Sequence, residues 1–178
     1  EVLRQPLEEG KVTISRAEGS VTYPAQILLI CAMNPCPCGQ LGNPRKSCRC
    51  TPRQIELYLS RISGPLLDRI DLHLEITSLK YEEMTEGSVG EGSKEIRERV
   101  KEARRIQRER YKEYSPEFCN ASLGPQELLR YCPVPEEARG LLRDAIQELG
   151  LSMRAHDRIL KVARTIADLE GTSQIQTS

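Results

Sequence analysis

The chain has 178 residues, and its 26 lysines and arginines are balanced by 26 aspartates and glutamates. This balance excludes a global field that would attract nucleic acid or a membrane surface, so any anion site has to be local. No stretch approaches the ~18 apolar residues of a membrane span and the first residues show no signal-peptide pattern, so we expect a cytoplasmic protein with no membrane partner. The chain starts in mid-pattern without a methionine, which indicates a piece of a longer protein.

The first third of the chain has the sequence patterns of β-strands. Residues 11–24 contain two alternating runs on either side of the turn letters AEGS, which predicts a β-hairpin. Residues 26–33, QILLICAM, are continuously apolar, as expected of a strand buried on both faces of a parallel sheet. Asn34 lies at the carboxyl end of this predicted strand.

A helix and another strand follow. Thr51, Pro52 and Gln54 combine a capping hydroxyl, proline at the first helical position and a capping-box glutamine, so a helix should begin here. Residues 70–76 alternate apolar and polar side chains, which predicts a strand. The fold class expected for residues 1–80 is therefore α/β.

The rest of the chain has the sequence patterns of helices. Residues 81–92 are rich in glutamate, glycine and serine and predict a linker between two domains, 1–80 and 93–178. Apolar residues at helical spacing and helix start and stop signals predict an all-α bundle with four helices, over residues 93–114, 125–131, 135–149 and 152–169.

Four of the seven cysteines form two C-x-C pairs, Cys36 with Cys38 and Cys48 with Cys50. Four thiolates are the number that tetrahedral zinc prefers, and in a reducing compartment such pairs favour metal over disulfides. We therefore predict a structural zinc site that has no open position for catalysis. The alternatives are free thiols packed in a loop and a redox relay.

Three polar residues are candidates for chemistry. Asn34 ends a predicted buried strand, where an amide can orient a water or a phosphate oxygen, although asparagine before proline also forms turns. Arg154 opens the last helix, where a cation is unfavourable unless an anion compensates it, so a phosphate site competes with a surface salt bridge to Asp157. Arg69 follows a turn and could extend toward a neighbouring subunit or form a local ion pair, and Arg61 is the competing candidate.

Four stretches together resemble the magnesium-chelatase-like AAA+ ATPase family, in its ComM/YifB branch: RQPLEEGKVTISRA, YPAQILLICAMNPCPCG, SRISGPLLDRIDLHLEI and LSMRAHDRILKVARTIADL. They cover most of residues 4–170. The resemblance implies the C-terminal part of an AAA+ P-loop core followed by the helical lid. The cysteines distinguish the chain from authentic chelatase subunits, so porphyrin metallation is not expected.

The resemblance also implies roles for single residues. Asn34 matches the sensor 1 position, Arg69 the arginine finger and Arg154 the sensor 2 arginine, which would act on ATP with Mg²⁺. Residues 11–24 match the pre-sensor 1 hairpin, so Lys11 and Arg16 are expected to contact DNA.

The resemblance further implies a homo-oligomeric ring, expected to be a hexamer, that couples ATP hydrolysis to DNA remodelling or branch migration in competence. The G-x-x-x-x-G-K-[ST] phosphate loop is absent from these 178 residues and is expected upstream, so the piece alone should not hydrolyse ATP.

Two rival hypotheses remain. The cysteine loop and the basic residues 97–112 could form a zinc-stabilised nucleic-acid-binding module with no ATPase role. Residues 93–170 could instead be a helical docking domain for a partner protein.

Overall fold

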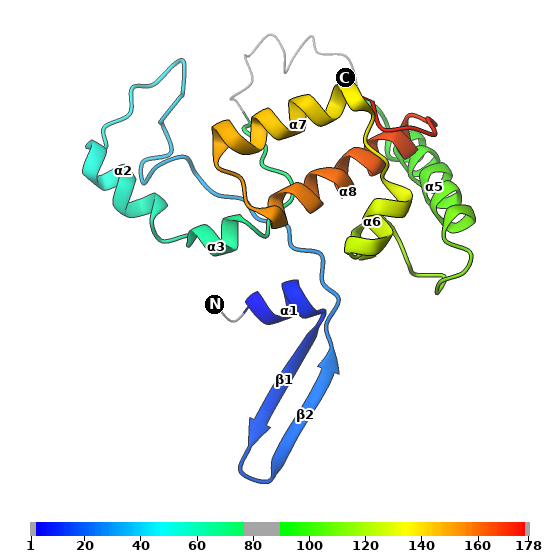
Figure 1. Cartoon of the computed structure of the whole chain (residues 1–178). Helices are drawn as coiled ribbons and strands as arrows, with labels where there is room; N and C mark the ends of the chain where they lie inside the picture. The colour runs from blue at the N-terminus through cyan, green and yellow to red at the C-terminus, as the bar shows by residue number, and fades with distance from the viewer. Residues whose placement is uncertain (1–2, 77–89, 177–178) are drawn as a thin grey trace. The chain divides into compact units, whose positions relative to one another are not determined.

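The computed structural model describes residues 3–76 and 90–176, and the chain divides into two compact units, Glu1–Gly87 and Ser88–Ser178 (Figure 1). Within the described residues, the first unit contains a two-stranded antiparallel sheet and three short helices, and the second unit is helical. This agrees with the expected partial α/β core followed by a helical lid. The linker predicted over residues 81–92 lies almost entirely outside the described residues.

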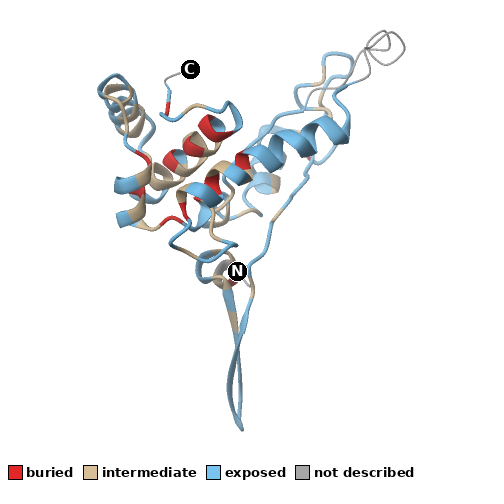
Figure 2. Cartoon of the chain, turned by 90° about the vertical axis from the view of Figure 1, so that its right-hand side faces the viewer, coloured by how far each residue is buried: buried red, intermediate tan, exposed pale blue. Residues whose placement is uncertain are grey.

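The first unit begins with helix α1 (Arg4–Glu9) and the hairpin of β1 (Lys11–Arg16) and β2 (Gly19–Pro24). The strands pair in antiparallel register from Lys11 opposite Pro24 to Arg16 opposite Gly19. Nearly all hairpin residues are exposed, as the pale blue ribbon in Figure 2 shows. The predicted hairpin is confirmed, and it is stabilised by its ladder and not by a core.

The two other predicted strands are not formed within the described residues. Segments 26–33 and 70–76 belong to no sheet there, since the described sheet consists of β1 and β2 alone. Their apolar side chains are open to solvent: Leu28 is 86% exposed, Ile30 is 83% and Ile76 is 90%. A strand needs a neighbour to complete its ladder, and no described segment pairs with either run. An apolar pattern favours a strand but does not provide that neighbour.

The predicted helix start at Thr51 is confirmed. In α2 (Pro52–Leu59) the Thr51 hydroxyl accepts from the backbone of Gln54, and the Gln54 side chain accepts from the backbone of Thr51 at 2.8 Å. After α2, Gly64 and Pro65 begin the short helix α3 (Gly64–Leu67). Proline suits a first helical turn, where its missing N–H has no partner to lose.

The second unit contains α5 (Ser93–Arg110), the 3₁₀ turn η1 (Asn120–Ser122), α6 (Pro125–Tyr131), α7 (Glu136–Leu149) and α8 (Met153–Leu169). These match the predicted helices, except that α5 ends at Arg110 and not at residue 114. Helix α8 packs against α5, α6 and η1. Among the described residues, no helix has both the length and the hydrophobicity needed to cross a membrane.

The buried residues of the second unit, which are red in Figure 2, include a hydrophobic core. Tyr111 lies at its centre, with its ring centroid 5.3 Å from that of Phe118 and 5.0 Å from that of Tyr131 in edge-on packing. The buried members of this core are Tyr111, Leu123, Leu128, Cys132, Leu160 and Ile175. The lid therefore buries part of its own apolar surface in a core of its own.

Candidate functional site

The four paired cysteines meet in one cluster. The Sγ atom of Cys36 lies 3.4 Å from that of Cys38 and 3.7 Å from that of Cys48, and Cys38 and Cys48 are 3.6 Å apart. All four sulfurs, including that of Cys50, lie within 4.8 Å of one another. The geometry therefore brings together the complete set predicted from the two C-x-C pairs.

Tight turns in the loop between the pairs make this convergence feasible. Gly39 has φ of +71° and Gly42 of +77°, values that other residues rarely adopt. Between the pairs, the Asn43 side chain accepts a hydrogen bond from the backbone of Arg45 at 2.8 Å, which closes a further turn.

The electrostatics of the cluster favour a bound cation. Hydrogen bonds from the backbone of Arg49 and Gln40 lower the pKa of the Cys38 thiol to about 6. Burial instead raises the pKa of the Cys50 thiol to about 12. Several thiolates cannot lie this close without repelling one another, and a cation relieves that repulsion.

The sulfur geometry fits zinc in particular. Zinc–sulfur bonds of about 2.3 Å in a tetrahedron place the sulfurs about 3.8 Å apart, close to the three separations given above. Four sulfur ligands complete the coordination of Zn²⁺ and leave no position for a substrate. Such a centre would hold the loop in shape without taking part in a reaction.

Asn34 is exposed and lies at the start of the cysteine loop. A side chain built on Gly39 would lie 3.7 Å from Cγ of Asn34, so the amide packs against the turn that carries Cys36 and Cys38. The structure thus brings Asn34 next to the cysteine cluster, two residues before Cys36.

Arg69 is not extended. Its guanidinium donates to the backbone carbonyl of Pro65 and to the carboxylate of Glu8 on α1, and its side chain is only 5% exposed. Nothing in the sequence pointed to Glu8, which lies 61 residues away.

Arg154 is exposed in the first turn of α8, two residues after the cap. The Ser152 hydroxyl accepts from the backbone of Ala155 at 3.2 Å, which fixes the start of the helix. Asp157, the expected salt-bridge partner, accepts from Nδ1 of His156 at 3.0 Å.

The remaining predicted site residues lie on the surface of the first unit. Lys11 is at the base of the hairpin with its Nζ 3.5 Å from Glu9, and Arg16 is exposed at the end of β1. Arg61, the alternative finger, is exposed just after α2. None of these positions by itself indicates a ligand.

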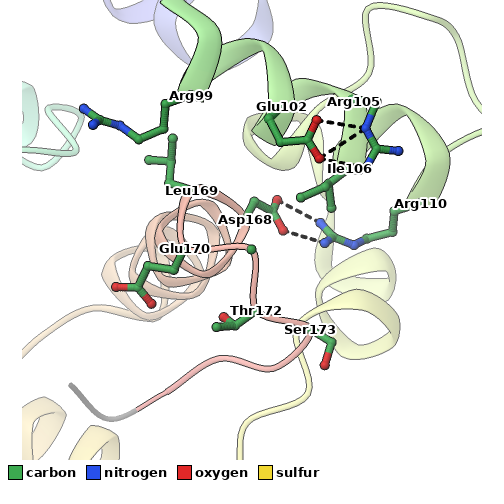
Figure 3. Close-up of a pocket in the computed structure, with 11 residues that line it drawn as sticks. Arg99, Glu102, Arg105, Ile106, Arg110, Asp168, Leu169, Glu170, Thr172 and Ser173 are labelled. Carbon is green, nitrogen blue, oxygen red and sulfur yellow. Dashed lines mark hydrogen bonds and ion pairs between the residues drawn. The ribbon is translucent and has the colours of Figure 1, made fainter. Parts of the chain in front are cut away.

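The lid contains a buried polar network around Asp168 on α8. Asp168 accepts two hydrogen bonds from Arg110 at 2.9 and 2.5 Å, one from Asn120 at 2.9 Å and one from Arg164 at 3.2 Å (Figure 3 draws the Arg110 pair). Tyr111 in turn donates to Asn120 at 2.7 Å. Arg164 is 1% exposed and forms an ion pair with Asp168.

A sequence signal for this network existed. Leu160, Arg164, Ala167 and Asp168 follow the spacing of one buried helix face. Two opposite charges four residues apart on such a face predict a buried ion pair, which the sequence analysis did not recognise.

The described residues of the lid also line a pocket of about 670 Å³ next to this network (Figure 3). Three arginines face it, but each has a carboxylate partner; the pairs are Arg99 with Glu91, Arg105 with Glu102 and Arg110 with Asp168. The pocket therefore offers little net charge for a phosphate.

Two family models match the chain, one after the other. Residues 1–84 match the model described as magnesium chelatase, subunit ChlI, and residues 90–178 match the model of the ChlI C-terminal region. Between them they cover both units of the structure.

Similar proteins extend this relationship. The chain is 44% identical over 176 residues to competence protein ComM of Haemophilus influenzae, 44% over 177 residues to YifB of Salmonella typhimurium and 38% over 172 residues to an uncharacterised protein of Mycobacterium tuberculosis. Each alignment takes in at least 96% of the chain and 33% of the relative, so the chain spans about a third of the length of these relatives. The chain therefore belongs to the magnesium-chelatase-like AAA+ family, in the branch that contains ComM and YifB.

Proposed function

We propose that the chain supplies the sensor 1, arginine-finger and sensor 2 residues of a ring-forming ATPase that remodels DNA. The observation that carries this proposal is the match of both halves to the chelatase family together with 44% identity to ComM over nearly the whole chain. In it, Asn34 is sensor 1, Arg69 the finger and Arg154 sensor 2.

The chemistry of these side chains suits the roles. ATP with Mg²⁺ would supply the phosphoryl group, held in part by groups outside these 178 residues. An asparagine amide orients a water or a phosphate oxygen, and an arginine fork places fixed positive charge where charge gathers during transfer. Arg154 lies exposed in the first turn of α8, where its charge adds to that of the N–H groups of a helix start.

The hairpin is the proposed DNA contact. It is exposed along its length and carries Lys11 and Arg16 at opposite ends of β1. Its ladder keeps the two cations at fixed positions, as a pore-facing element requires. The proposal includes a hexameric ring of identical subunits and a cytoplasmic location, where DNA and ATP are both present.

We also propose that Cys36, Cys38, Cys48 and Cys50 bind structural zinc. The support is the sulfur geometry, together with the lowered pKa of the Cys38 thiol. The loop runs from Asn34 to the start of α2, so the metal would fix the position of the sensor amide without entering the reaction.

Steady-state ATP turnover of the full-length gene product, with and without DNA, tests the proposal. Replacing Arg154 with alanine should lower turnover at least ~100-fold, the effect of losing a group that stabilises transition-state charge. Arg143→Ala is the matched control, because Arg143 is an exposed arginine of the same unit whose Nε lies 3.2 Å from Asp144. Equal turnover in the two variants would exclude the sensor 2 role.

The finger needs its own comparison. Arg69→Ala and Arg61→Ala should differ, with turnover lost only in the first. Loss only in Arg61→Ala would transfer the role to Arg61.

The alternative, a zinc-stabilised nucleic-acid-binding module without an ATPase role, has support from the cysteine geometry but less from the basic helix. On α5 several cations are already paired, as Lys101 is with Glu98 at 2.8 Å and Arg105 with Glu102 at 2.7 Å. Chelation that abolished DNA binding, with normal turnover in Arg154→Ala, would favour this alternative.

A further inference from the structure

The contact between Glu8 and Arg69 joins two distant parts of the first unit. Arg69 follows α3, and Glu8 belongs to α1, directly before the hairpin. The Glu8 carboxylate accepts from Nη2 of Arg69 while the Pro65 carbonyl accepts from Nη1. In this position the guanidinium is turned into its own subunit and is covered by it.

The buried position of Arg69 is only partly satisfied. Among the described residues, Nε of Arg69 is the one buried side-chain nitrogen or oxygen without a hydrogen-bond partner. A buried donor that lacks a partner opposes burial. The attraction of the Glu8 carboxylate therefore helps to hold the Arg69 guanidinium in its buried position. Another anion could compete with Glu8 for this guanidinium.

Helix α1 and the hairpin are connected so that they move together. Gly10, with φ of +61°, joins them, and its carbonyl accepts from the backbone of Ala25 after β2 at 2.7 Å. The Gln5 side chain also accepts from the backbone of Thr13 in β1 at 3.3 Å. A force that displaces the exposed hairpin would therefore displace Glu8 as well.

We propose that Glu8 is a positioning residue that keeps Arg69 inside its own subunit until the hairpin moves. This inference rests on the proposed function, in which Arg69 acts on the nucleotide of the next subunit. The carboxylate of Glu8 and the phosphates of that nucleotide compete for one guanidinium. DNA that displaces the hairpin weakens the Glu8 contact, so the finger is delivered when DNA is bound.

The first test is ATP turnover of full-length Glu8→Gln, which keeps the shape of the side chain and removes its charge. Turnover without DNA should rise about fivefold to tenfold and stimulation by DNA should shrink accordingly, since a charge-assisted hydrogen bond becomes a neutral one. Glu9→Gln is the control, because Glu9 is the adjacent carboxylate and contacts Lys11. Unchanged or lower DNA-free turnover in Glu8→Gln would overturn the inference.

A second measurement follows Arg69 directly and does not depend on turnover. Phenylglyoxal reacts with accessible guanidinium groups, and mass spectrometry locates the adduct. Arg69 should be protected in the wild type without DNA and reactive in Glu8→Gln or when DNA is added. Equal reactivity in all three states would overturn the inference even if a variant were poorly active.

Arg69→Ala separates this inference from the proposed function. If turnover falls at least ~100-fold in Arg69→Ala but Glu8→Gln behaves as the wild type, the finger role stands and only the role of Glu8 fails. If Arg69→Ala retains wild-type turnover, both fail.

Discussion

Replacing Asp168 with alanine should destabilise the lid by about 3–5 kcal/mol, the usual cost of removing one partner from a buried ion pair. The carboxylate is 1% exposed and accepts from Arg110, Asn120 and Arg164. Alanine would leave the buried Arg164 guanidinium without its counter-charge, although its hydrogen bonds to the carbonyls of Thr172 and Ser173 remain. Those two bonds limit the expected cost to this range.

Hydrogen exchange of the α8 amides measures this effect in the lid alone. A loss of 3–5 kcal/mol corresponds to exchange faster by about two to three and a half orders of magnitude. Asp144→Ala is the control, since Asp144 is an exposed aspartate paired with Arg143, and should change stability by less than about 0.5 kcal/mol. If Asp168→Ala came within about 1 kcal/mol of this control, the network would not stabilise the lid.

Three further predictions concern metal, pH and helix capping. Elemental analysis should find about one zinc per chain, lost in Cys36→Ser and retained in Cys31→Ser, because Cys31 is outside the cluster; equal zinc in both variants would exclude the site. Burial would raise the pKa of Asp168, but hydrogen bonds from Arg110 and other donors outweigh it and hold the pKa below its ordinary value of 3.8. Because the pKa of Asp168 is lower in the folded than in the unfolded protein, its carboxylate stabilises the lid at any pH above its pKa in the unfolded protein, and this contribution is lost as the pH falls through its pKa in the folded protein. The free energy of unfolding of the lid should therefore decrease only below about pH 4. A decrease already at pH 6 would contradict this. Ser152→Ala should lower lid stability by about 1 kcal/mol through loss of the cap, measured by urea denaturation, and no change would mean that the cap is not needed.

Helix starts were predictable because their signals are local. The Thr51 cap with Pro52 and Gln54 specifies α2 within four residues, and Ser152 does the same for α8. The hairpin was predictable for the same reason, since its turn and its alternation lie in one short stretch. In each case the residues that stabilise the helix or hairpin are the same residues from which it was predicted.

The strands and the polar network were not predictable in this way. Segments 26–33 and 70–76 have strand patterns, but a ladder requires a partner elsewhere in space. The role of Asp168 depends on Asn120 and Arg110, 48 and 58 residues away. The contact between Arg69 and Glu8 was likewise not predictable from the sequence, because the two residues are 61 positions apart.

The cysteine cluster lies between these two cases. Its four cysteines were predictable from spacing, because each C-x-C pair is local and a tetrahedral zinc site would need four sulfurs. Its relation to Asn34 was not, since it depends on the turn at Gly39 that places the amide against the loop. The sequence therefore predicted a metal site and a sensor residue separately, and in the structure Asn34 lies beside the turn that carries Cys36 and Cys38.

The two units differ in what stabilises them. Every residue of the hydrophobic core belongs to the lid. In the described part of the first unit, Cys36 is the one residue counted among the buried hydrophobic side chains. With so little apolar burial, the first unit depends on its hairpin ladder, the cap of α2, the contact between Glu8 and Arg69 and the cysteine loop. Two of these four features, the Glu8 contact and the cysteine loop, act on proposed catalytic residues, Arg69 and Asn34. Metal bound to the cysteines would consequently stabilise the same region that positions the sensor, while the lid and Arg154 keep their structure without it.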